Sequence, residues 1–153
     1  MTRPRLAAVL MTALALPGAA MAQPAESNHS YTRTVEGSFE DVSFAVEQAI
    51  INDGLVIDLT SHVGDMLSRT REDVGGGTEL FTGADIYSFC SAVMSRQVME
   101  ADVTNIQFCP YNIFVYETPD AAGQVVVGHR TYPGDSMAPV NEMLTRLVDS
   151  VAD

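Results

Sequence analysis

Apolar residues recur along the chain at two spacings, which predict helices and strands in turn. Residues 39–50 carry apolar side chains at helical spacing; Ser38 and Asp41 give a capping-box-like start, and Gly54 gives a stop. The clearest helical stripe, at a period of 3.6 residues, lies after a predicted cap at Ser136. It consists of Val140, Met143, Leu144, Leu147, Val148 and Val151.

Shorter segments alternate between apolar and polar residues or are rich in strand-forming residue types. They predict strands over 31–35, 55–60, 84–89, 111–117 and 125–131. Two further helices are predicted. One covers 63–74 and ends at three glycines, and the other has Ser91 as its predicted cap and runs to about Asp102. In the second of these, Arg96 and Glu100 have the spacing of a helical ion pair.

The predicted order of elements is β-α-β-α-β-α-β-β-α. The last two strands are joined by a turn over 119–123, which predicts a hairpin. Each element is apolar on one side, and the simplest way to bury such elements is to pack helices on one face of a sheet. The sequence therefore predicts an α+β fold, a two-layer sandwich with a mostly antiparallel sheet and helices on one face.

The first 22 residues have the three parts of a cleavable secretory signal peptide. Two arginines form a positive start, an apolar run follows over 6–16, and small residues stand where signal peptidase cleaves. The run is shorter than the roughly 20 apolar residues of a spanning helix, so no membrane span is expected after cleavage. This predicts a periplasmic protein with a disordered lead-in over 23–29 and a single domain over 30–153.

The charge of the chain excludes one class of partner. Cleavage removes two arginines and no acidic residue, which leaves six basic residues against 20 acidic ones, a net charge of −14. A protein of this charge repels nucleic acids and anionic lipids. The expected partner is a small molecule or a periplasmic protein, and a homodimer is the expected oligomer.

Several motifs together resemble one family, the domain of unknown function 302 family. They are Ser38-Phe39-Glu40-Asp41-Val42, Phe89-Cys90-Ser91-Ala92, Cys109-Pro110-Tyr111 followed by Ile113-Phe114-Val115-Tyr116-Glu117, and Val127-Gly128-His129-Arg130. The resemblance runs from about Tyr31 to the C-terminus and implies a compact α+β domain, often bacterial and often exported. Many members have Gly-Asn-Pro where this chain has Cys90-Ser91-Ala92, which places the chain in a cysteine-bearing exported branch. The family's name assigns no activity.

Cys90 and Cys109 are the two cysteines of the chain. In an exported protein an even number of cysteines predicts a disulfide, here between the end of one strand and the start of another. The alternatives are a metal-binding or redox-active pair, or two buried free thiols. The sequence has no C-x-x-C motif, so a thioredoxin-type exchange site is disfavoured.

His62 follows the second strand, at a position where the resemblance implies a histidine. With Cys90, Cys109, Met94 and Met99 it would form a ligand set soft enough for copper. The alternatives are a capping or solvated histidine and methionines that fill the core. His129 lies on an apolar strand face, which is typical of a core histidine.

The sequence contains no assembled catalytic set and identifies no cofactor. The favoured hypothesis is a non-catalytic exported domain that binds a small ligand, a metal or a partner protein. The second is a periplasmic metal-binding or redox protein that uses Cys90, Cys109 and His62. The third is an enzyme of unknown class with His62 as its base.

Overall fold

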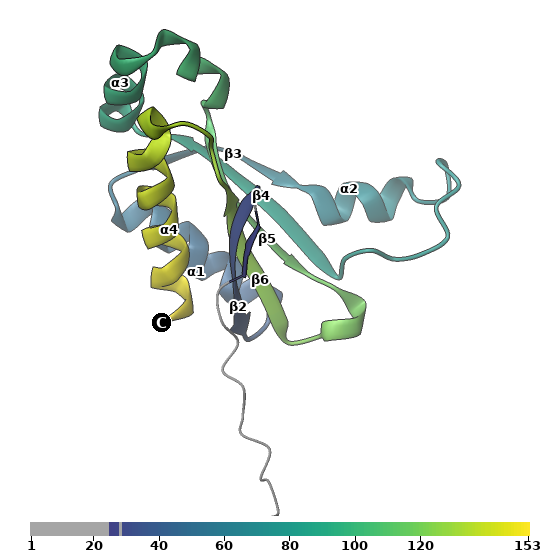
Figure 1. Cartoon of the computed structure of the whole chain (residues 1–153). Helices are drawn as coiled ribbons and strands as arrows, with labels where there is room; N and C mark the ends of the chain where they lie inside the picture. Colours follow the sequence, from purple (N-terminus) through teal and green to yellow (C-terminus); the bar gives the residue numbers. More distant parts are fainter. Residues whose placement is uncertain (1–24, 28) are drawn as a thin grey trace, which may run out of the picture.

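The structure is a computed structural model that describes residues 25–27 and 29–153 (Figure 1). Its helices and strands are β1 (Ala25–Ser27), β2 (Ser30–Glu36), α1 (Phe39–Asn52), β3 (Val56–His62), α2 (Val63–Thr70), β4 (Gly83–Cys90), α3 (Ala92–Ala101), β5 (Tyr111–Glu117), β6 (Gln124–Arg130) and α4 (Ala138–Ala152). Short 3-10 helices η1 (Val103–Phe108), η2 (Pro119–Ala121) and η3 (Asp135–Met137) lie between them.

The strands form one antiparallel sheet in the order β1-β2-β6-β5-β4-β3. Helices α1 and α4 pack side by side on one face of this sheet (Figure 1). Between the two layers lies the core, which includes Val46, Ile50, Val115, Val127 and Leu144. The predicted α+β sandwich, with its order of elements and its final hairpin, is confirmed.

The structure differs from the prediction at the N-terminus of the domain. Within the lead-in predicted to be disordered over 23–29, residues Ala25–Ser27 form β1, which pairs with β2. Pairing with the edge of the sheet orders a segment whose own sequence carries no strand signal. The predicted signal peptide, 1–22, lies outside the described residues. Among the helices that are described, none combines the length and apolar character needed to span a bilayer.

Two of the three predicted helix caps are confirmed. Ser38 accepts a hydrogen bond from the backbone of Asp41, and Ser91 accepts one from the backbone of Met94. Ser136 does not cap α4; it lies in η3, and its hydroxyl accepts a hydrogen bond from the side chain of Asn105. The Ser136 hydroxyl therefore bonds to a side chain of η1 instead of to the backbone at the start of α4.

Helix α2 is shorter than predicted and is not part of the helical layer that α1 and α4 form. It ends at Thr70 rather than at 74, and the residues after it form a turn and a long loop. Figure 1 shows α2 projecting from the end of β3, on the opposite side of the sheet from α1 and α4. It approaches β4 closely: a Cβ added to Gly64 would lie 2.7 Å from the backbone nitrogen of Ala84. We call residues 63–82 the arm.

Candidate functional site

The structure brings Cys90 and Cys109 together. Cys90 ends β4, and Cys109 stands between η1 and β5. The two strands are neighbours, with Phe89 opposite Tyr111, so the cysteines that flank this pair meet at one end of the sheet. Their Sγ atoms are 2.7 Å apart, and both are free thiols in this structure. A disulfide bond is about 2.05 Å long, so a small movement would allow the bond to form.

The protonation of Cys90 argues against a reactive thiol. Burial, then the hydrogen bond and the charge of Cys109, and last the charge of Asp58 raise the pKa of the Cys90 thiol to about 12. Thiolates are the species that attack disulfides and bind metals, and reactive cysteines therefore have lowered pKa values. This arrangement favours a structural role for the pair.

His62 forms a different site at the other end of β3 and β4. Its Nδ1 lies 2.8 Å from a carboxylate oxygen of Asp85, with which it pairs across the two strands. The His62 side chain is 61% exposed and that of Asp85 is 12% exposed. An Nδ1–H that donates to the carboxylate leaves Nε2 facing solvent as an acceptor. Asp85 is not among the predicted site residues, because only the strand register places it opposite His62.

The predicted soft-metal set does not assemble around the cysteines. His62 and Cys90 stand near opposite ends of the β3–β4 pair, and the distance from Asp85 to Cys90 along β4 is roughly 17 Å. Met94 and Met99 are half-buried on α3 and pack against the core. Within 25–27 and 29–153, no three His, Cys, Asp or Glu side chains are grouped as a metal site would need.

His129 is a core residue, as its place in the alternating pattern indicates. Only 1% of it is exposed. Its Nδ1 donates to the backbone carbonyl of Arg130 at 2.8 Å, and its Nε2 accepts from the hydroxyl of Thr145 at 3.0 Å. Burial lowers its pKa, against smaller opposing effects of the Arg130 hydrogen bond and the Asp149 charge. The side chain is therefore a neutral link between β6 and α4.

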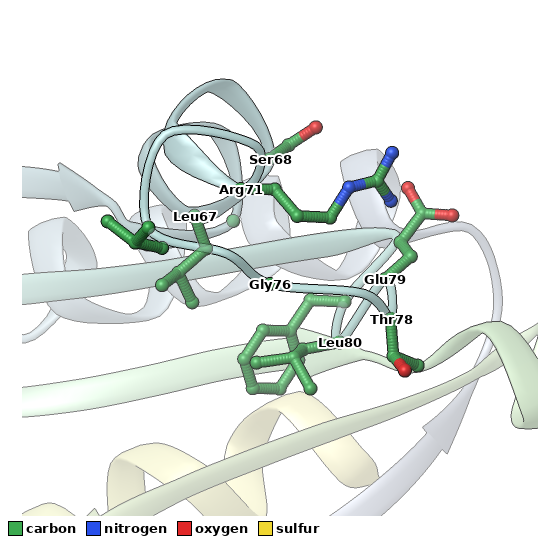
Figure 2. A pocket seen from close by; sticks show the side chains of 10 residues that line it. Leu67, Ser68, Arg71, Gly76, Thr78, Glu79 and Leu80 are labelled. Atoms are coloured by element: carbon green, nitrogen blue, oxygen red, sulfur yellow. The ribbon is translucent and has the colours of Figure 1, made fainter.

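A small apolar cavity lies inside the arm. Figure 2 shows Leu67 of α2 and Leu80 of the following loop turned toward one space, with the polar ends of Ser68, Arg71 and Glu79 pointing away from it. The volume is about 100 Å³. This is less than the roughly 150 Å³ that takes a benzene molecule, and well below the roughly 300–1,000 Å³ of metabolite pockets. The cavity suits a single aliphatic side chain better than a metabolite.

The fold and these sites define a two-layer α+β domain with a thiol pair at one end of its sheet and an arm at the other. Residues 31–152 match the family described as "Domain of unknown function DUF302", and the chain belongs to this family. A solved structure described as an uncharacterized conserved protein DUF302 from Bacillus stearothermophilus is similar, with a TM-score of 0.64 and 16% sequence identity. The match covers 80% of this chain and 97% of that chain, and at this identity it shows the fold alone. No curated protein matches.

Proposed function

We propose that this chain is an exported, non-catalytic member of the family that carries a Cys90–Cys109 disulfide and binds a partner protein. The observation that carries this proposal is the sulfur pair, with Sγ atoms 2.7 Å apart. A disulfide persists only in an oxidising compartment, such as the periplasm predicted by residues 1–22. The proposal places the chain in a cysteine-bearing, exported branch of its family.

Cys90 and His129, two side chains capable of chemistry, have structural roles in this molecule. The Cys90 thiol has a raised pKa, which disfavours a nucleophile or a redox catalyst. His129 uses both of its ring nitrogens to join β6 to α4. The cavity in the arm has the size of one side chain and is too small for a metabolite.

Cell fractionation with thiol labelling tests export and the disulfide together. The full chain is produced in a bacterial host beside a matched variant that lacks residues 1–22, and both are labelled with a maleimide under denaturing conditions. We expect the full chain in the periplasm with no thiol labelled, and the variant in the cytoplasm with both Cys90 and Cys109 labelled. Full chain that stays in the cytoplasm, or that carries two labelled thiols in the periplasm, would overturn the proposal.

A second candidate function rests on the His62–Asp85 pair. A carboxylate that holds Nδ1–H leaves Nε2 as a general base, which is the arrangement of a hydrolytic site. A screen of hydrolase and oxidoreductase substrates compares the wild-type protein with His62→Gln. Turnover that disappears in His62→Gln would establish the enzyme and contradict the non-catalytic proposal; turnover by neither protein supports that proposal.

A further inference from the structure

The bond proposed between Cys90 and Cys109 is accessible from one side. Cys90 is exposed, whereas Cys109 is half-buried. Cys90 lines an open hollow of about 410 Å³ between the end of α1, the start of β3 and the start of α3. Exposed valines flank it there: Val56, opposite Cys90 across the two strands, and Val93. Exposed disulfides are the labile ones, open to exchange with other thiols, so a thiol that enters this hollow can react at Cys90.

The two sulfurs differ in ways that set the direction of such an exchange. A thiolate attacks one sulfur of a disulfide and the other sulfur leaves, so access and the pKa of the leaving thiol decide which one is attacked. Cys90 is the more exposed sulfur, and its raised pKa makes it the poorer leaving group. The hydroxyl of Ser95 lies 3.8 Å from Sγ of Cys109, where it can donate to a departing thiolate. Attack at Cys90 with release of Cys109 is therefore favoured.

The hollow beside Cys90 is acidic. Asp53 at the end of α1 and Asp58 on β3 line it, and none of the described residues that line it is basic. After burial and the neighbouring thiol, the charge of Asp58 is a further cause that raises the pKa of Cys90, so this charge reaches the sulfur. The nearby basic residue of α3, Arg96, is paired with Glu100 at 2.9 Å. An incoming thiolate is an anion, which the two acids repel unless positive charges accompany it.

We propose that the Cys90–Cys109 disulfide captures a partner protein through a cysteine that lies between basic residues. The partner's thiolate attacks Sγ of Cys90 and forms a mixed disulfide, while the bond to Cys109 breaks. Cys109 leaves as a thiolate and takes up the proton that the partner's thiol has lost, so the exchange needs no oxidant or reductant. This inference rests on the disulfide and the partner binding proposed above, and it names the chemistry of the partner.

Peptide exchange with the oxidised protein purified from the periplasm tests where the bond opens. Two blocked peptides are used, one with a cysteine between two lysines and one with a cysteine between two glutamates. Each reaction is stopped early in acid, and mass spectrometry of protein fragments locates the peptide. We expect the peptide on Cys90 and a free thiol on Cys109. A peptide on Cys109, or no exchange with either peptide, would overturn the capture site.

Variants that neutralise the acids test the kind of partner. The measured quantity is the initial rate with the lysine peptide divided by that with the glutamate peptide, a ratio in which the intrinsic reactivity of each peptide is the same for every variant. At low ionic strength we expect an Asp53→Asn, Asp58→Asn double variant to lower this ratio at least about threefold. The control is a Glu72→Gln, Asp73→Asn double variant, which removes two exposed acids from the arm and should change the ratio by less than about 1.5-fold. An unchanged ratio in the Asp53→Asn, Asp58→Asn variant would overturn the basic partner.

Thiol labelling of the starting protein separates this inference from the function on which it rests. Protein in which both Cys90 and Cys109 are labelled before any peptide is added has no bond to open, and this result would overturn both proposals. Protein without labelled thiols that fails to exchange would overturn the capture site alone and leave the exported, bridged domain standing. All four substituted acids are exposed, and thermal unfolding midpoints equal to that of the wild type show that the variants keep the fold.

Discussion

At the scale of single residues, Asp149 joins the first long strand to the last helix. One of its carboxylate oxygens accepts from the hydroxyl of Tyr31 at 2.7 Å and from the guanidinium of Arg33 at 2.8 Å. We expect Asp149→Ala to lower the free energy of unfolding by about 1–2 kcal/mol, because Tyr31 and Arg33 both lose their partner. Urea denaturation measures the change.

Asp153 provides the control for this prediction. It also faces Arg33, but at 3.8 Å and with its side chain 78% exposed. We expect Asp153→Ala to change the free energy of unfolding by less than about 0.5 kcal/mol. Equal losses in the two variants would show that the contacts of Asp149 contribute nothing beyond its charge.

His129 makes the stability of the domain depend on pH. Its pKa is lowered in the folded state by burial, whereas in the unfolded chain it has an ordinary value near 6.5. Below about pH 6.5 the unfolded state therefore binds more protons, and stability is lost as the pH falls. We expect the free energy of unfolding to fall by up to about 1.4 kcal/mol per pH unit in this range.

Urea denaturation at about pH 7.5 and about pH 5.5 measures this dependence. The same measurement on His129→Gln should show a smaller dependence of the free energy of unfolding on pH than the wild type shows. If the free energy of unfolding of His129→Gln depends on pH as strongly as that of the wild type, the dependence comes from a group other than His129.

The sequence predicts residue contacts well where both partners lie close along the chain. The caps at Ser38 and Ser91 and the ion pair between Arg96 and Glu100, at 2.9 Å, are all local. The contact between His62 and Asp85 joins residues 23 positions apart and depends on the register of β3 against β4. Local patterns carry no information on that register.

At the scale of elements, the segment between Cys90 and Cys109 contains α3 and η1 and lies outside the two main layers. A bond between these cysteines would close this segment at its base. The side chain of Asn105 supports it from within, donating to the carbonyl of Val98 at 2.8 Å. The disulfide is therefore expected to stabilise α3 and η1 more than the rest of the fold.

Hydrogen exchange before and after reduction tests this local effect. Reduction should lower the global stability by about 3 kcal/mol and speed exchange first in α3 and η1, with α4 as the internal reference. A Cys90→Ser, Cys109→Ser double variant should match the reduced protein. Equal acceleration of exchange in α4 would mean that the bond acts on the whole domain instead.

Element types were predictable from periodicity, but two elements depend on tertiary contacts. The predicted helix over 63–74 ends at Thr70, because its apolar residues have no core to pack on beyond the first two turns. Strand β1 forms because the edge of β2 is available to pair with it. Neither effect leaves a signal in the local pattern of polar and apolar residues.

At the scale of the whole molecule, the charged residues are distributed unevenly. The centre of the sheet face turned away from α1 and α4 carries none, whereas the arm carries Asp65, Glu72, Asp73 and Glu79 beside its exposed apolar side chains. The composition reveals the net charge, but only the alternation of residues across four paired strands reveals the neutral face.

Native mass spectrometry of the protein released from the periplasm under non-reducing conditions tests the proposed export and disulfide most directly. The predicted result is a chain that lacks residues 1–22 and is lighter by two hydrogen atoms than its reduced form. A chain that retains residues 1–22, or that has both thiols free, would contradict it.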